Sequence, residues 1–285
     1  MKYYLFTTYY ISEDQERNDE NFRCLKENYN LDLISRIFLF LQNQEKPEIS
    51  DSKNKIEYVT INKRPKFSDF FNFTNQLNNE DTRFIIANSD IFFDETLSLL
   101  NELEIENKVI TLTRWDLQND NSLKFYNKFL SQDVWIFSDK INPKTGDYFI
   151  GQHGCDNRLL FELDQAGKKI INPSLSVKTI HVHMSQLRPY FNDPNYKYVQ
   201  SPYKYSLPHG LTPSYKEIFN QILRSNNQWN YNLRDYYYIR FEYNLFRLYN
   251  TLQKVNVSLI GRIISVPKVV FYYCLFQLFR LKKLS

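Results

Sequence analysis

The chain has 285 residues, of which 42% are hydrophobic, 17% aromatic and 24% charged. This composition excludes a disordered chain, and the length allows one large domain or one domain with an appendage. Three widely spaced cysteines exclude a disulfide framework and a zinc site of cysteine alone, so a reducing compartment is the simpler interpretation. Only six glycines occur, without a glycine-rich phosphate loop, which argues against a dinucleotide-binding dehydrogenase and a P-loop kinase.

The net charge of +4 is unevenly distributed along the chain. Residues 229–285 carry +7, whereas residues 1–228 carry −3. A uniformly basic nucleic-acid-binding protein would not divide its charge in this way, so we expect no nucleic-acid partner. The basic residues of the tail are interleaved with Phe, Tyr, Leu and Ile, which fits an anionic membrane surface.

The N-terminal apolar segment Tyr3–Tyr9 is short and β-prone, and no small-residue cleavage site follows it before the acidic Glu13 and Asp14. It is therefore predicted to be a first strand rather than a signal peptide. We expect a cytoplasmic protein, peripheral on the inner face of a membrane.

Strand-like and helix-like stretches then alternate through the first two thirds of the chain. In chain order, the predicted elements are strand Tyr3–Tyr9, helix Glu16–Tyr29, strands Arg36–Leu41 and Glu57–Ile61, helix Ser68–Leu77, strands Arg83–Ala87, Val109–Thr113 and Val134–Phe137, helix Asn157–Ala166, and strands Lys169–Ile171 and Val177–Val182. Such alternation predicts an α/β fold with a mostly parallel sheet flanked by helices.

The last third of the chain has a different character. Residues 189–213 are rich in Pro, Tyr, Asn and Ser, and helical stretches follow them up to the C-terminus. We divide the chain into an α/β domain (1–190), an irregular connection (191–228) and a helical, basic and aromatic tail (229–285). The uninterrupted apolar run Val269–Phe279 is shorter than the roughly 20 residues that cross a bilayer. Within 255–285 it predicts an interfacial segment, or alternatively a helix packed on the core or at a dimer interface.

The first polar motif is Asn88-Ser89-Asp90, directly after the predicted strand Arg83–Ala87. Ligands of open α/β sheets bind beyond the carboxyl ends of the strands. A carboxylate at this position can hold a divalent cation that bridges a diphosphate, or it can serve as a turn residue.

Two further motifs lie downstream. The segment Gly154–Asn157 opens a helix, so Asp156 is either a helix-terminal carboxylate or a general base above a ligand pocket. His181 and His183 alternate in a strand, so both imidazoles can point to one side and ligate a metal, or can be satisfied polar groups.

Three other residues are weaker candidates. Arg114 follows a strand end and is placed to contact a phosphate or a sugar, and Arg188 is able to bind a phosphate bidentately. Asp133 precedes the strand that contains Trp135, where it is either a pocket carboxylate or a turn residue. A structural role is the alternative for each.

In this order, the three motifs resemble those of the GT-A class of nucleotide-sugar-dependent glycosyltransferases, over roughly residues 1–190. The resemblance implies that the first strand and its loop, including Thr8 and Tyr9, hold the nucleoside. It implies that Asn88-Ser89-Asp90 corresponds to the family's Asp-x-Asp motif, which binds Mn²⁺ or Mg²⁺ and the donor diphosphate, although here the first carboxylate is an asparagine.

The resemblance also implies a mechanism. Asp156 matches the base that activates the acceptor hydroxyl in inverting enzymes, and His181 or His183 matches a histidine that completes the metal shell. The donor would be a nucleoside-diphosphate sugar and the acceptor a glycan or lipid-linked hydroxyl. Arg114 is assigned to the donor side, and the residues assigned to the acceptor side are Asp133, Trp135, Gly154, Asn157 and Arg188.

Two alternatives are retained. A nucleotidyltransferase of related architecture would need a basic phosphate-binding loop near the N-terminus, but residues 7–16 contain no Lys or Arg. A non-catalytic, membrane-associated carbohydrate-binding or scaffold protein would explain Asn88 in place of aspartate.

Overall fold

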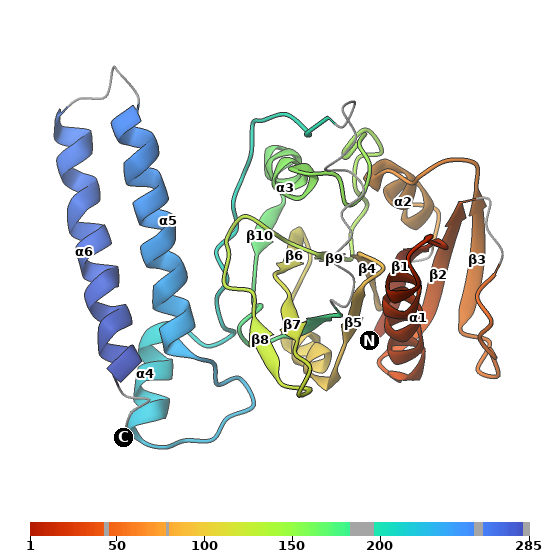
Figure 1. Ribbon diagram of the computed structural model, residues 1–285, viewed down its shortest axis with the longest axis horizontal. Helices are drawn as coiled ribbons and strands as arrows, with labels where there is room; N and C mark the ends of the chain where they lie inside the picture. Colours follow the sequence, from red (N-terminus) through yellow and green to blue (C-terminus); the bar gives the residue numbers. More distant parts are fainter. Residues whose placement is uncertain (43–45, 78–79, 183–196, 254–258, 282–285) are drawn as a thin grey trace.

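The computed structural model describes residues 1–42, 46–77, 80–182, 197–253 and 259–281. Figure 1 shows an α/β domain with a pair of long helices along one side. Within the described residues, the domain contains a sheet of seven strands and a smaller sheet of four. The strands of the large sheet, from one edge to the other, are β10 (Lys169–Ile171), β6 (Lys108–Leu112), β9 (Val134–Phe137), β4 (Thr82–Ala87), β1 (Lys2–Tyr9), β2 (Ile34–Gln42) and β3 (Ile56–Ile61).

The large sheet is mostly parallel. β1 runs parallel to β2 and β4, β2 to β3, and β6 to β10, whereas β9 is antiparallel to both of its neighbours. The strand order reverses beside β1, since β2 and β4 lie on either side of it. A reversal of this kind creates a crevice at the carboxyl ends of the strands, which is where open α/β sheets bind ligands. The predicted fold class, an α/β fold with a mostly parallel sheet and a helical C-terminal extension, is confirmed.

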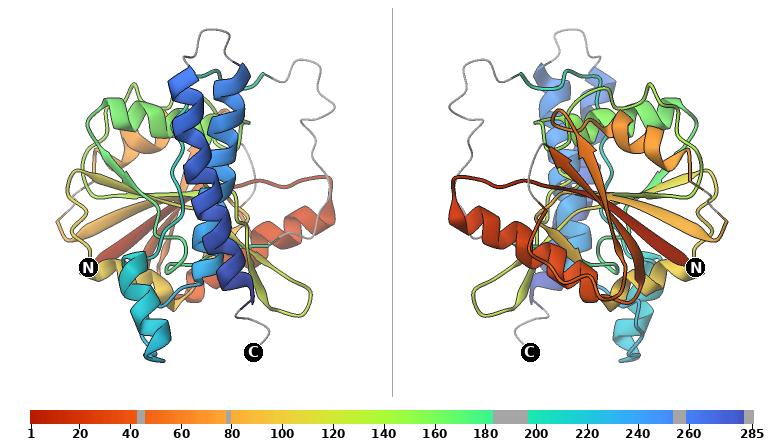
Figure 2. Two further views of the ribbon diagram at one scale, coloured as in Figure 1. Left: turned by 90° about the vertical axis from the view of Figure 1, so that its left-hand side faces the viewer. Right: turned by 90° about the vertical axis from the view of Figure 1, so that its right-hand side faces the viewer.

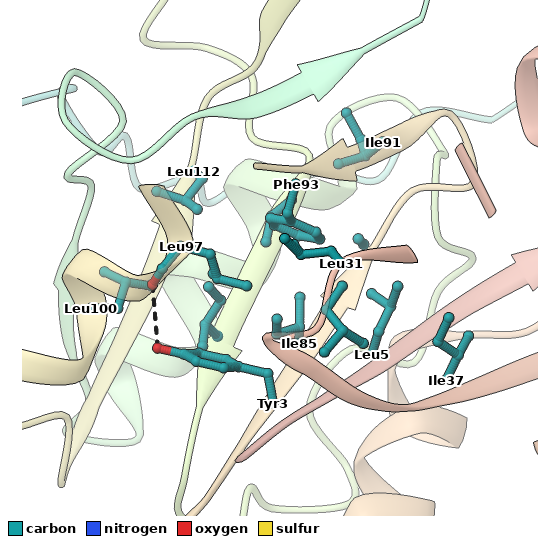
Figure 3. Packing of buried hydrophobic residues seen from close by; sticks show 14 of the residues in the cluster. Tyr3, Leu5, Leu31, Ile37, Ile85, Ile91, Phe93, Leu97, Leu100 and Leu112 are labelled. Atoms are coloured by element: carbon teal, nitrogen blue, oxygen red, sulfur yellow. Dashed lines mark hydrogen bonds between the residues drawn. The ribbon is translucent and has the colours of Figure 1, made fainter. Parts of the chain in front are cut away.

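Alternation of apolar side chains along the strands builds two core layers. Tyr3 and Leu5 face helix α1 (Gln15–Asn30) and a 3-10 helix (Glu95–Glu102), and the Tyr3 hydroxyl donates to the Leu97 carbonyl at 3.3 Å (Figure 3). On the other face, Phe6 stacks on Phe38 and packs with helices α2 (Phe67–Thr74) and α3 (Cys155–Gln165). Because both faces are covered by helices, the sheet is rigid and fixes the positions of its strand ends.

The small sheet was not predicted from the sequence. Its strands, in order, are β5 (Ile91–Phe93), β11 (Thr179–His181), β7 (Trp115–Leu117) and β8 (Leu123–Phe125). Each has only three residues, which is too few to produce a recognisable period of two. The predicted strand Val177–Val182 corresponds to β11, with shorter bounds.

The C-terminal region is helical, as predicted. A short helix α4 (Ser214–Ile222) precedes α5 (Leu233–Gln253) and α6 (Leu259–Leu281), which form an antiparallel hairpin beside the α/β domain (Figure 2). Aromatic pairs join the two helices: Tyr237 stacks on Phe279 with ring centroids 5.3 Å apart, and Phe241 lies 5.3 Å from Tyr273. Among the helices of the described residues, none combines the length and apolarity needed to span a membrane.

Candidate active site

Asn88 and Asp133 meet where the large sheet ends. β4 and β9 are antiparallel, with Ala87 opposite Val134, so the residue after β4 lies beside the residue before β9. The backbone N–H of Asn88 donates to the Asp133 carbonyl at 3.2 Å, and its side-chain amide donates to Asp133 Oδ1 at 3.0 Å. Asn88 therefore holds the Asp133 carboxylate, a contact that an aspartate at position 88 would not make.

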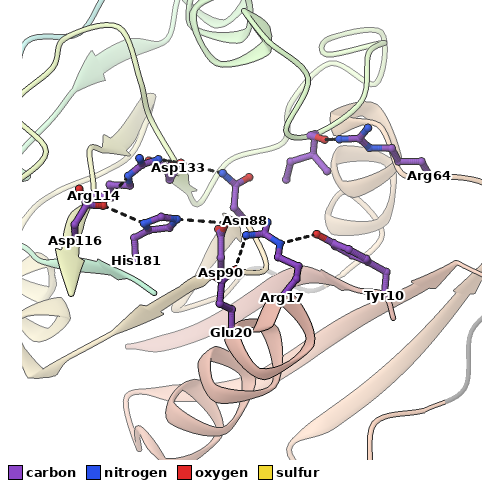
Figure 4. Close-up of polar contacts among 11 residues, drawn as sticks. Tyr10, Arg17, Glu20, Arg64, Asn88, Asp90, Arg114, Asp116, Asp133 and His181 are labelled. Carbon is purple, nitrogen blue, oxygen red and sulfur yellow. Dashed lines mark hydrogen bonds and ion pairs between the residues drawn. The ribbon is translucent and has the colours of Figure 1, made fainter. Parts of the chain in front are cut away.

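The small sheet brings Asp90, Asp116 and His181 together beside this pair. His181 lies opposite Ile91 on β5 and opposite Asp116 on β7, so its ring is placed between two carboxylates. His181 Nδ1 lies 3.0 Å from Asp116 Oδ1, and Nε2 lies 3.4 Å from Asp90 Oδ2 (Figure 4). Asp90 and His181, which the sequence assigned to a metal, are thus neighbours.

Two arginines complete the charged cluster. Arg114 binds Asp116 Oδ1 through Nε at 3.0 Å, and its Nη1 lies 3.7 Å from Asp133 Oδ1. Arg17, in the first turn of α1, binds Asp90 Oδ2 through Nη2 at 3.0 Å. The cluster thus alternates cationic and anionic side chains, all of them mostly or completely buried.

These contacts and burial shift the pKa values of His181, Asp90 and Asp133 in different directions. Burial alone would lower the pKa of His181, but Asp90 and Asp116 raise it to about 9, so the ring is protonated at neutral pH. Burial also opposes ionisation of Asp90, yet His181 and Arg17 hold the pKa of this carboxyl well below its usual range. Burial raises the pKa of Asp133, and Arg114 only partly offsets that rise.

Asp156 lies in the first turn of α3 and interacts electrostatically with Asp133. Its Oδ2 accepts from the backbone N–H of Gln132 at 3.2 Å, and its Oδ1 accepts from that of Asn157 at 2.9 Å. Burial raises the pKa of Asp156 to about 7, despite these two donors. A half-buried carboxylate with this pKa is suited to accept a proton near neutral pH.

The remaining predicted residues have varied positions. Thr8 and Tyr9 are the last residues of β1, one strand away from Asn88, and Ser89 lies between the two donor-side residues of its motif. Gly154 caps α3 with φ +81°, and a Cβ there would lie 2.9 Å from the Tyr203 hydroxyl. Asn157 is buried and donates to the Leu130 carbonyl at 2.6 Å, which ties a loop to the start of α3.

Trp135 does not lie where an acceptor would reach it. Its side chain is 1% exposed and packs edge-to-face on Phe67, with ring centroids 4.8 Å apart. The expectation of an acceptor contact is corrected here: successive strand residues face opposite sides, and Trp135 belongs to the side that faces the helices. His183 and Arg188 fall outside the described residues.

Sequence reasoning missed Arg17. It lies just beyond the cation-free residues 7–16, and its guanidinium also binds Glu20 at 2.7 Å and the Tyr10 hydroxyl at 3.0 Å. The only available signal was its place in the helix that follows the first strand. Arg64 was also missed; it donates to the Ile150 carbonyl at 2.7 Å in the loop that leads to α3 (Figure 4).

Two observations bear on whether a divalent cation suits this cluster. Asp90 Oδ1 and Asp133 Oδ2 are buried and have no hydrogen-bond partner among the described residues. In that same part of the chain, no group of three or more His, Cys, Asp or Glu side chains is arranged to hold a metal. The Asp90 carboxylate suits Mn²⁺ or Mg²⁺, which commonly bind one or two carboxylates and take their other ligands from substrate phosphates and water. His181 Nε2 would join it as a ligand only after releasing its proton. The residues present fit such a partial site.

No family model matches the sequence, and no curated protein is similar enough to count as a match. Solved structures of glycosyltransferases and nucleotidyltransferases are similar to the chain. The mannosyltransferase PcManGT from Pyrobaculum calidifontis, in complex with GDP-Man and Mn²⁺, is 9% identical, with 98% of this chain and 84% of that chain covered and a TM-score of 0.37. GalNAc-T7, in complex with UDP, GalNAc and Mn²⁺, is 6% identical over 65% of this chain and 44% of its own length, with a TM-score of 0.41.

A third similar structure, 4-diphosphocytidyl-2C-methyl-D-erythritol synthase from Anaerococcus prevotii, is 13% identical over 60% of this chain and 86% of that chain, with a TM-score of 0.34. At these identities and TM-scores the likenesses do not bear on the reaction. The fold class rests on the strand order and directions described above.

Proposed function

We propose that this protein transfers a sugar from a nucleoside-diphosphate sugar to a hydroxyl of a glycan or lipid-linked acceptor. The observation that carries the proposal is the pairing of two different carboxylate environments at one sheet edge. Asp90 belongs to a charged cluster suited to a diphosphate and its cation, and Asp156 is a half-buried carboxylate with a pKa near 7. Asp133 interacts electrostatically with both of these aspartates, and Asn88 donates a hydrogen bond to it.

On the donor side, Thr8 and Tyr9 would contact the nucleoside, and Asn88, Ser89 and Arg114 the diphosphate. Asp90 and His181, with His183 as the alternative histidine, would hold Mn²⁺ or Mg²⁺. When bound, such a cation neutralises the negative charge that develops on the leaving diphosphate. Arg114 adds a positive charge beside Asp133 and can donate two hydrogen bonds to a phosphate.

On the acceptor side, Asp156 would take the proton of the attacking hydroxyl. The acceptor oxygen then forms a bond to the anomeric carbon while the bond from that carbon to the diphosphate breaks, with inversion. Asp133 would bind the acceptor together with Gly154, Asn157 and Arg188.

Calorimetric titration with a panel of nucleoside diphosphates, with and without Mn²⁺, tests the donor half. We expect Mn²⁺-dependent binding of one nucleotide and its loss in Asp90→Ala. A folded protein that binds none of them would support the scaffold alternative. Nucleotidyl transfer is distinguished by its product, because it releases pyrophosphate instead of a nucleoside diphosphate.

We further propose that the hairpin α5–α6 rests on an anionic membrane surface at the cytoplasmic face. α6 packs against α5 through Phe276 and Phe279, while Val270 and Phe271 on its outer side are 53% and 59% exposed. Exposed Lys268 and Arg280 accompany this apolar face, and residues 229–285 carry +7. An apolar stripe with flanking cations is typical of a helix that lies in the lipid headgroup region.

Vesicle co-sedimentation tests this surface. Phe271→Glu should reduce binding to vesicles that contain phosphatidylserine by about tenfold. The reason is that a negative charge then replaces an apolar ring that would be buried in the lipid headgroup region. Gln76→Glu, in the turn that follows α2, makes the same change in net charge on a remote surface and should leave binding unchanged. Equal binding to purely zwitterionic vesicles, or a dimer in solution that buries Phe271, would contradict the proposal.

A further inference from the structure

We infer that Arg17 occupies the cation position on Asp90 when no divalent cation is bound there, and turns to the donor diphosphate when a divalent cation takes that position. This inference rests on the proposed function. It assigns to Arg17 two roles in succession: a competitor of the cation and a ligand of the phosphate.

The contacts of Asp90 carry the first role. Its Oδ2 is shared between Arg17 Nη2 at 3.0 Å and His181 Nε2 at 3.4 Å, while its Oδ1 is buried without a hydrogen-bond partner in the described residues. Within that part of the chain, Asp90 Oδ2 is thus already contacted by two side chains, and only Oδ1 is free to bind another group. A divalent cation on Asp90 would be repelled by the guanidinium, so its binding favours departure of Arg17.

The other contacts of Arg17 carry the second role. Nη1 binds the buried Glu20 at 2.7 Å, three residues along α1, and Nε donates to the Tyr10 hydroxyl at 3.0 Å. Both partners belong to the β1–α1 region, so they can keep Arg17 at the site after it leaves Asp90. The Arg17 side chain is 21% exposed, so an incoming ligand can contact it from solvent.

The chemistry of the guanidinium suits this exchange. It remains charged at every relevant pH and offers a planar set of donors that matches two phosphate oxygens. Released from Asp90, Nη2 would be available to a phosphate of the donor. The cation and the diphosphate therefore favour each other's binding. The cation displaces Arg17 from Asp90, and the diphosphate binds the guanidinium that is released.

The test uses the whole 285-residue chain and two probes. Mn²⁺ alone is titrated with the free-ion signal in electron paramagnetic resonance, and inorganic pyrophosphate is titrated calorimetrically at saturating Mn²⁺. Arg17→Met should bind Mn²⁺ about tenfold more tightly and pyrophosphate about tenfold more weakly than the wild type. A purely structural role for Arg17 would weaken both.

Arg36→Met is the matched control, because it removes an exposed arginine that pairs with Glu57 at 2.6 Å away from the site. It should leave both affinities unchanged. Arg17→Lys provides a second variant in case methionine impairs folding: the charge is kept, so Mn²⁺ affinity should stay near the wild-type value, while pyrophosphate binds more weakly.

The outcomes separate the two proposals. If the wild type binds Mn²⁺ and Arg17→Met binds it no more tightly, the inference about Arg17 is wrong while the metal site stands. If neither protein binds Mn²⁺, the metal site and the inference are both wrong. If Mn²⁺ binding improves in Arg17→Met and pyrophosphate binding does not weaken, the phosphate role is excluded.

Discussion

The proposed donor and acceptor halves of the site contain aspartates whose pKa values move in opposite directions. Asp90 is surrounded by His181 and Arg17, which keep it ionised, whereas the hydrogen-bond donors to Asp156 are neutral amides of Gln132 and Asn157, and burial raises the pKa of Asp156 to about 7. The difference shows how one sheet edge can hold a fixed negative charge beside a group that exchanges a proton. Carboxylates whose environments separate their pKa values commonly divide structural and acid–base roles in this way.

The largest expected effect comes from removing the base. Asp156→Asn should lower turnover about a thousandfold, since a positioned general base contributes roughly 10²–10⁴ in rate. Binding of the nucleoside diphosphate with Mn²⁺ should be unchanged, because the donor half is intact. The measurement is kcat with the identified donor, alongside the calorimetric titration.

Asp164→Asn is the matched control for this variant. Asp164 lies on the same helix, in a half-exposed ion pair with Lys204 at 2.8 Å, and its loss should leave kcat within about twofold. Wild-type turnover in Asp156→Asn would show that the two aspartates do not divide the roles as proposed.

A second, smaller effect is the pH dependence of the wild type. Asp156 accepts a proton only when it is ionised, so kcat should rise about tenfold per pH unit below pH 7 and level off above it. Between pH 5 and pH 8 the increase amounts to about a hundredfold. A rate that falls over this range would assign Asp156 to a general acid instead.

The sequence predicted the large sheet well because five of its seven strands alternate or are continuously apolar over five to nine residues. Leu5, Phe38 and Ile85 lie in buried strands as expected. The motif Asn88-Ser89-Asp90 was recognisable because it follows such a strand directly. Where a strand is long, its hydrophobic pattern identifies it in the sequence, and its end fixes the position of the residues that follow.

The small sheet and the contacts of the site could not be predicted in the same way. Three-residue strands carry no measurable period, and only their pairing places Asp116 and His181 side by side. Arg17 reaches Asp90 from a helix 73 positions earlier in the chain, a contact that depends on the packing of α1. Trp135 was misassigned because the sequence does not indicate which face of a strand points toward the site.

The smallest expected effect concerns stability, and its sign follows from the raised pKa of Asp156. The folded protein retains a proton on Asp156 up to about pH 7, whereas the unfolded chain releases it near 3.8. The stabilising contribution of this group is therefore present below the unfolded value and is lost as pH rises through 7, and the full shift corresponds to about 4 kcal/mol. Asp156→Asn cannot ionise, so its free energy of unfolding does not fall as pH rises through 7. Partial exposure and the mismatch of an amide N–H with the donors Gln132 and Asn157 reduce the gain, so we expect about 2 kcal/mol at pH 8.

The measurement is the free energy of unfolding in urea at pH 8 and pH 5. The advantage of Asp156→Asn should shrink at the lower pH, where the wild-type carboxyl is protonated in the folded state. The Asp164→Asn control should differ from the wild type by less than about 1 kcal/mol at either pH, because exposed ion pairs contribute little. Under the proposed function, ionisation of Asp156 makes the protein less stable at the same pH at which it supports the transfer. An Asp156→Asn variant that is inactive but no more stable would mean that burial does not raise the pKa of Asp156.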